Sequence, residues 1–286
     1  GKGPMTVTAL GELGTYDTNR EMVSARGGGE SYDYSFGWSR YRTAGWSIAS
    51  EERGMGTERD GAQNNTFNGK IGISPTDNSE IEIRGSHTDF WGEMDGAGTG
   101  SRVGGTMDTM RRKNKHTDTG SVKGSLALFD GIWTQTLNAS AIRNDQWNDG
   151  GSTTACTVGG PLCAAYLGTT ANASWQHDLR LIDGHVTSVG YEDTRDYFWM
   201  RQYQQKSRIT SSSMRNTAPF FQHQAHLFDQ LDLSGGWRGN DHDTFGWKPT
   251  WFTTAAWHLP TGTGTTVKGS YGTTFKAPLL YQIYYP

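Results

Sequence analysis

The sequence is poor in the features that would build a large soluble domain. Only 34% of its 286 residues are hydrophobic, and it has 8 prolines and 2 cysteines against 39 glycines. A soluble domain of this length would need a larger apolar core. No run of about 18 apolar residues occurs, which excludes a membrane-spanning helix. The net charge of −3 leaves no basic excess, so nucleic acid is not an expected partner. The first residues, Gly1 to Pro4, lack the features of a signal peptide, which indicates a mature or truncated form.

Residues of opposite character alternate along most of the chain. In the clearest stretch, Ile81 and Ile83 share one face of an expected strand, while Glu80, Glu82 and Arg84 share the other. A stripe of charged residues needs water, so the sheet is expected to have one apolar and one aqueous side. In a membrane barrel only every second residue faces lipid, which accounts for the low hydrophobic fraction.

Short turns and long connections alternate between these strands. The pattern predicts about thirteen strands in a transmembrane antiparallel up-and-down β-barrel, an all-β fold. The crossovers of a β-sandwich and the repeats of about 40 residues that mark a propeller are both missing. Short turns are expected at 74–79, 129–131, 182–184, 228–230 and 260–264, and long connections at 45–64, 91–116, around the two cysteines, and at 197–215.

The last eighteen residues, GSYGTTFKAPLLYQIYYP at 269–286, combine glycine, lysine, proline and aromatics in a specific order. They resemble the Y-G-T-x-F-K-A-P-x-L-x-Q-L-Y segment midway along the barrel of TonB-dependent outer-membrane receptors, above all of the cobalamin-receptor type. RYRTAG at 40–45 and GWRGNDHDTFG at 236–246 favour the same branch. The resemblance implies a 22-stranded barrel. Residues 1–286 are therefore expected to form one partial barrel domain, about its first thirteen strands, without the N-terminal plug.

The resemblance also implies a function. A receptor of this family lies in the cell outer membrane, surrounded by lipid and lipopolysaccharide, and takes up a scarce large ligand when the TonB complex acts through the plug. The expected ligand is cobalamin, with a ferric siderophore as the alternative and heme after it. A passive porin or an outer-membrane enzyme barrel is the competing class, but no Ser-His-Asp, paired-carboxylate or phosphate-loop pattern supports catalysis. The eight histidines are scattered and predict no ligand set.

Two groups of residues are candidates for substrate binding. Arg111, Arg112 and Lys113 belong to the most basic stretch of the chain, which is expected in a long loop. Clustered Lys and Arg suit lipopolysaccharide phosphates or an anionic iron chelate, although a solvated loop tip would have the same composition. Tyr281 and Tyr284 lie in the expected loop after the closing motif.

The segment from Glu51 to Gly61 has the densest set of carboxylates. Calcium prefers several oxygens on a flexible loop. The segment also resembles the region where cobalamin receptors hold calcium with aspartates, which makes Asp60 and Glu58 the candidate ligands. Arg53 and Arg59 lie among these acids, so a solvated charged loop is the alternative.

The two cysteines, Cys156 and Cys163, flank the turn-forming residues Gly159, Gly160 and Pro161. A chain reversal there would bring the two sulfurs within bonding distance. We therefore expect a loop disulfide in an oxidising compartment. A metal site is the alternative, but no further Cys or His lies near enough in the sequence to complete one.

Overall fold

The computed structural model describes residues 3–47, 59–97, 106–149, 164–202, 208–260 and 264–284. These residues form one antiparallel sheet of thirteen strands, and each strand pairs only with its neighbours in the sequence. The predicted up-and-down topology and strand number are thereby confirmed. No helix in these ranges is long and apolar enough to cross a membrane. The elements are β1 (Gly3–Gly14), β2 (Thr18–Gly28), β3 (Tyr32–Thr43), β4 (Ala62–Thr76), β5 (Ser79–Ala97), β6 (Thr106–Leu128), β7 (Trp133–Asp149), β8 (Ala164–Leu179), β9 (His185–Gln202), β10 (Arg208–Leu227), β11 (Leu231–His242), β12 (Gly246–His258), β13 (Thr266–Gly272) and the short helix α1 (Leu280–Tyr284).

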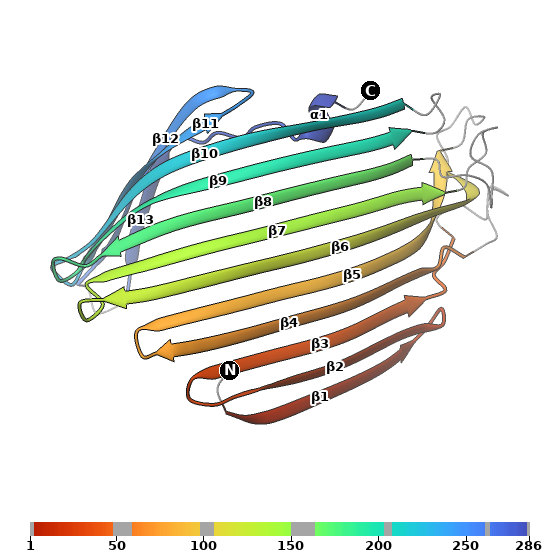
Figure 1. Cartoon of the computed structure of the whole chain (residues 1–286), viewed down its shortest axis with the longest axis horizontal. Helices are drawn as coiled ribbons and strands as arrows, with labels where there is room; N and C mark the ends of the chain where they lie inside the picture. The colour runs from red at the N-terminus through yellow and green to blue at the C-terminus, as the bar shows by residue number, and fades with distance from the viewer. Residues whose placement is uncertain are drawn as a thin grey trace.

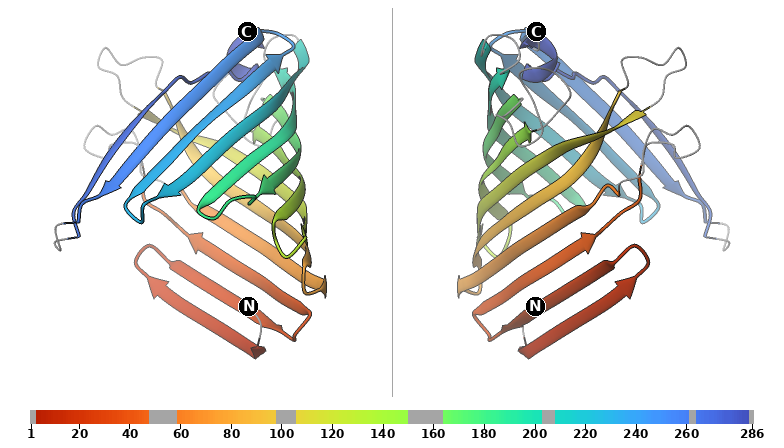
Figure 2. Two further views of the ribbon diagram at one scale, coloured as in Figure 1. Left: turned by 90° about the vertical axis from the view of Figure 1, so that its left-hand side faces the viewer. Right: turned by 90° about the vertical axis from the view of Figure 1, so that its right-hand side faces the viewer.

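The strands run side by side in chain order, and the sheet is twisted and curved into an open trough (Figures 1 and 2). β3, β5, β7 and β9 all end at one end of the trough, which we call the long-connection end. The turns after β4, β6, β8 and β10 lie at the opposite end, the short-turn end. Short turns at one end and longer connections at the other are the arrangement of an up-and-down membrane barrel.

Three hairpin turns share an unusual backbone. In each, two consecutive residues other than glycine have φ between 52° and 60°. Positive φ at both central residues is the geometry of a type I′ turn, whose twist matches that of the flanking strands. Each turn has an aromatic residue followed by aspartate, which tolerates this region better than most residues. The three pairs are Tyr16 and Asp17, Phe129 and Asp130, and Phe228 and Asp229.

One face of the sheet, which we call the outer face, exposes a band of apolar side chains. The register pairs Ile83 with Ile71 on one side and with Val122 on the other, and it pairs Leu137 with Trp175. All five side chains are exposed. Exposed apolar side chains that alternate with polar ones are expected of strands whose outer face contacts lipid.

The opposite face, which we call the inner face, has charged side chains in place of the apolar ones. Lys70 Nζ lies 3.1 Å from Asp33 Oδ2 and 3.0 Å from Glu82 Oε2, so one cation joins carboxylates from β3 and β5 across β4. Arg84 Nε lies 2.7 Å from Glu82 Oε1. The prediction of one apolar and one aqueous side is confirmed.

Two of the predicted long connections are shorter than expected. Residues 91–116 and 197–215 were assigned to connections, but β5 and β6 enclose only residues 98–105, and β9 and β10 enclose only residues 203–207. β6 has 23 residues and β10 has 20, about twice the 9–11 that a tilted strand needs to cross a bilayer. Beyond the apolar band a strand has water on both sides, so its sequence no longer alternates and resembles a loop.

Candidate functional site

The helix α1 packs against the inner face of the sheet, on β9 and β10 (Figure 1). Its anchor is Leu280, which is 5% exposed and packs with Phe198, Met200 and Met214. The Tyr281 ring stands edge-on to Phe198, with the ring centroids 5.9 Å apart. The sequence predicted only a loop here. A helix of five residues has little stability of its own, so its existence depends on this packing.

Further aromatic rings extend this contact over the inner face. The imidazole of His242, only 5% exposed, lies 4.8 Å from the Phe245 ring and 6.3 Å from the Phe275 ring. Tyr166 lies 6.4 Å from Tyr281. We call Tyr166, Phe198, His242, Phe245, Phe275 and Tyr281 the aromatic cluster. Of the two tyrosines that the sequence analysis proposed, Tyr281 joins this cluster with 44% of its surface exposed, and Tyr284 is 39% exposed.

A polar network adjoins the aromatic cluster. Arg238 donates from Nη2 to Glu192 Oε1 at 2.7 Å and from Nε to Asn240 Oδ1 at 3.0 Å. Asn216 donates to the same Asn240 oxygen at 3.3 Å, and Asn240 donates to the carbonyl of Lys248 at 3.2 Å. Asn240 precedes His242 of the aromatic cluster by two residues, so both side chains lie on the inner face of β11. Cationic and aromatic groups thus meet on one surface. This network could not be predicted from the sequence, because its members come from four strands.

The basic stretch is not the loop tip that was expected. Arg111, Arg112 and Lys113 all lie within β6. Strand alternation places Arg112 on the outer face and the other two positions on the inner face. The Arg112 guanidinium lies 5.6 Å from the centre of the Trp91 ring and 3.6 Å from a Glu93 oxygen. The helix with the two C-terminal tyrosines contacts β9 and β10, whereas these basic residues lie on β6.

Asp60, one of the two candidate calcium ligands, is buried just before β4, with 9% of its surface exposed. Its backbone N–H donates to the Trp46 carbonyl at 3.4 Å. The next residue, Gly61, donates its N–H to Glu93 Oε2 at 3.1 Å. Glu93 is therefore a second carboxylate near Asp60, and it was missed because its position was assigned to a connection. Calcium binding by Asp60 stays a prediction.

Three of the predicted site residues lie outside the part of the chain that the structure describes. Glu58, the second candidate calcium ligand, belongs to the connection between β3 and β4. Cys156 and Cys163 belong to the connection between β7 and β8. The role of Glu58 and the predicted disulfide therefore stay predictions.

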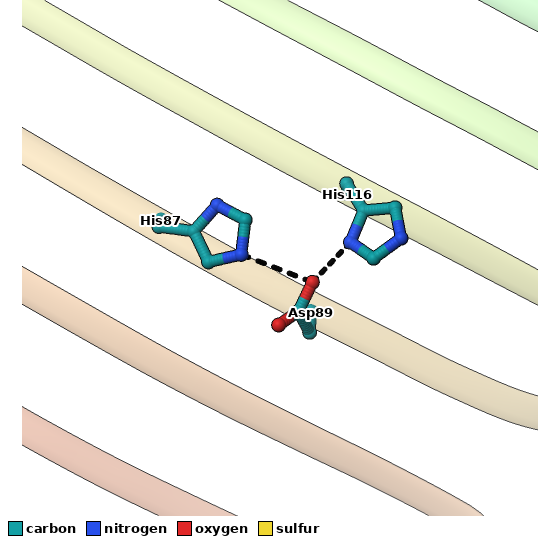
Figure 3. A group of neighbouring side chains, drawn as sticks. All are labelled: His87, Asp89 and His116. Atoms are coloured by element: carbon teal, nitrogen blue, oxygen red, sulfur yellow. Dashed lines mark hydrogen bonds and ion pairs between the residues drawn. The ribbon is translucent and has the colours of Figure 1, made fainter.

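The sequence predicted no ligand set among the histidines, but the structure brings two of them close to one aspartate. The register of β5 and β6 pairs His87 with Asp118 and Asp89 with His116. The side chains of His87, Asp89 and His116 meet on the outer face, and their potential metal-binding atoms lie within 4.8 Å of one another (Figure 3). This group could not be predicted while Trp91 to His116 was expected to be a loop, because a loop has no cross-strand pairing.

Comparisons with known proteins give the architecture a family context. No protein-family model matches the sequence. The fold is similar to that of the siderophore receptor PirA from Acinetobacter baumannii, with a TM-score of 0.73, 15% identity, and coverage of 97% of this chain and 43% of that one. A mutant of the ferric enterobactin receptor PfeA from Pseudomonas aeruginosa has a TM-score of 0.72 and 16% identity, with coverage of 97% of this chain and 44% of that one. The copper transporter OprC has a TM-score of 0.75 and 11% identity, with coverage of 100% of this chain and 49% of that one.

These structures are less than 20% identical to the chain, so the likeness concerns the fold. The chain covers 43–49% of their length, and the match includes 97–100% of its own residues. The thirteen-stranded sheet, its lipid-type outer face and its charged inner face agree with this match. The chain therefore has the fold of the β-barrel of TonB-dependent outer-membrane receptors.

Proposed function

We propose that this chain is part of an outer-membrane receptor that takes up a ferric siderophore, with energy supplied through a TonB complex. The observation that carries the proposal is the up-and-down sheet of thirteen strands with an apolar outer face and a charged inner face. Such a sheet suits a barrel wall between lipid and an aqueous lumen. The ligand would enter from the long-connection end and meet the inner face. Two of the three similar structures reported above are siderophore receptors.

The inner-face surface around α1 suits a ferric siderophore in its chemistry. Ferric siderophores are large, and many are anionic and aromatic. The exposed rings of Tyr281 and Tyr284 offer apolar faces on which a planar ligand group can stack. The Arg238 guanidinium has five N–H groups, of which its recorded hydrogen bonds to Glu192 and Asn240 use two. The remaining groups can bind ligand oxygens.

Cobalamin is the second candidate. The closing motif at 269–286 favours it, and so does Asp60, which belongs to a segment that resembles the calcium-binding region of cobalamin receptors. None of the three structures reported above is named as a cobalamin receptor. A cobalamin receptor of that type would bind its ligand more tightly when calcium is present, which separates the two candidates.

The test is equilibrium binding to the complete receptor, purified in detergent, of a panel of ferric siderophores and of cobalamin, with and without calcium. We expect saturable binding of one siderophore class that Tyr281→Ala weakens about tenfold, which corresponds to about 1.4 kcal/mol. Tyr191→Ala is the matched control, because Tyr191 is exposed to a similar degree but lies on the outer face. Calcium-dependent binding of cobalamin, without binding of any siderophore, would overturn the proposal that the ligand is a ferric siderophore. Failure to bind any of these ligands would overturn the receptor function.

A further inference from the structure

We propose that His87, Asp89 and His116 form a binding site for a divalent transition-metal ion, best suited to Zn²⁺, on the outer face of β5 and β6. This site goes beyond the proposed receptor function, because it lies on the face opposite to the one that a transported ligand would meet. Its existence does not depend on the identity of that ligand.

The sheet geometry brings the three side chains together. His87 and Asp89 are two residues apart on β5, so they share a face, and His116 is the cross-strand partner of Asp89 on β6. His87 Nε2 lies 3.1 Å from Asp89 Oδ1, and His116 Nδ1 contacts the same oxygen. Both rings point toward this carboxylate (Figure 3). Zinc bound at about 2.0–2.1 Å in a tetrahedral site has ligand atoms about 3.3 Å apart, so small side-chain rotations would accommodate the ion.

A second carboxylate orients one of the rings. His87 Nδ1 lies 2.6 Å from Asp118 Oδ1, on the side of the ring away from Asp89. When Nδ1–H donates to Asp118, Nε2 of the neutral ring presents a lone pair toward Asp89. A metal-bound histidine commonly donates its other N–H to a carboxylate in this way. Asp118 therefore acts as a positioning residue for His87.

The facing acceptor atoms at this position call for a positive charge between them. Without an ion, the Nε2 lone pair of neutral His87 would face an Asp89 carboxylate oxygen, and two acceptors repel each other. A proton on His87 alone would also remove that repulsion, because the imidazolium would donate to both Asp118 and Asp89, so the metal ion and this proton compete for the same ring nitrogen. A single divalent ion satisfies both neutral rings and the carboxylate together. Two histidines and one carboxylate form a ligand set that zinc favours.

The position of the site makes it accessible. The side chains of His87, Asp89 and His116 are 39–43% exposed, and the His116 ring packs 4.7 Å from Trp147, which restricts its orientation. The apolar pair Ile83 and Val122 lies four residues closer to the short-turn end on the same two strands. The site thus lies on the long-connection side of that pair, next to the exposed side chain of Phe67, which pairs with His87 in the register.

A second His–Asp–His group provides a matched control. His226 Nδ1 lies 2.6 Å from Asp232 Oδ1, whereas His258 Nε2 lies 2.8 Å from the other oxygen of that carboxylate, Oδ2. The two histidines therefore approach opposite oxygens, and their nitrogens do not converge on one point. Among the residues that the structure describes, only the group at His87 brings three potential ligand atoms within 4.8 Å of one another.

The test is calorimetric titration of ZnCl₂ into the complete receptor in detergent, after treatment with a chelator. We expect a saturable site that His116→Gln and Asp89→Asn each weaken at least a hundredfold. Asp118→Asn should weaken it 10- to 100-fold, the range typical of a residue that orients a metal-bound histidine. Asp118→Glu should restore most of the affinity, which a merely structural role would not predict. The double control His226→Gln/His258→Gln should leave zinc binding unchanged.

A spectroscopic readout and a folding check complete the experiment. Co²⁺ bound to the wild-type protein should show the visible absorption of a tetrahedral site, and His116→Gln should abolish it. Each variant must keep the heat-modifiable gel mobility of a folded barrel, and His87→Gln replaces any removal variant that does not. Absence of a saturable zinc site in the wild type would overturn the proposal. An unchanged titration in folded His116→Gln or His87→Gln protein would overturn it equally.

Discussion

Replacing Lys70 with methionine tests how much the charged inner face stabilises the sheet. Methionine keeps most of the apolar stem but removes a cation that lies 3.1 Å from Asp33 and 3.0 Å from Glu82. The side chains of these carboxylates are 15% and 13% exposed, so water screens their charges only in part. A hydrogen bond to a charged group contributes about 1.5–3 kcal/mol. With the 29% exposure of Lys70 and the remaining Arg84 contact taken into account, we expect the free energy of unfolding to fall by about 2 kcal/mol.

The assay is equilibrium unfolding of the complete protein in detergent with urea, followed by tryptophan fluorescence. Lys123→Met is the matched control, because Lys123 pairs with Glu82 in the register but forms no ion pair with any residue in the described ranges. The control should change the free energy of unfolding by less than about 0.5 kcal/mol. Equal losses from both substitutions would refute the reasoning, since a general effect of net charge would then explain them.

Three further substitutions test other parts of the fold. Gly45→Ala should lower the urea midpoint by the equivalent of about 1–3 kcal/mol, because φ at this residue is 67° and a Cβ would overlap the Asp60 carbonyl. Leu137→Arg should cost about 2–4 kcal/mol in a lipid bilayer, whereas Asn138→Arg on the inner face should cost under about 1 kcal/mol, and similar losses would argue against the lipid-facing assignment. Leu280→Ala should reduce hydrogen-exchange protection of α1 by about 2 kcal/mol, and unchanged protection would show that this buried side chain does not anchor the helix.

The sequence was sufficient to predict the topology, because period-two alternation and turn residues are local signals. Ile81 and Ile83 identify the outer face of β5 without any knowledge of its neighbours. The ends of the long strands were not predictable in the same way. Toward the long-connection end, polar residues such as Asp89 and His116 occur on both faces of β5 and β6, and their pairing depends on a register that only the folded sheet defines.

The candidate sites also divide into those with a local sequence signal and those that depend on strand pairing. Tyr281 was identified because it belongs to a distinctive motif, but its helical conformation depends on the packing of Leu280 against distant strands. The network around Arg238 and the group at His87 were missed because each depends on pairs from different strands, such as Asn216 and Asn240 or Asp89 and His116, that are 24–46 residues apart in the sequence. Residues so far apart become neighbours only through the pairing of extended hairpins.

The pairing order of the sheet has a consequence for how the protein folds. Every strand from β2 to β12 contacts only the strands immediately before and after it in the chain, so each contact closes a loop of modest length. Such a low contact order allows assembly by successive addition of hairpins, each templated on the last strand already formed. Disruption of one internal hairpin would therefore prevent the strands that follow it from joining the sheet, whereas the strands before it could still pair with one another.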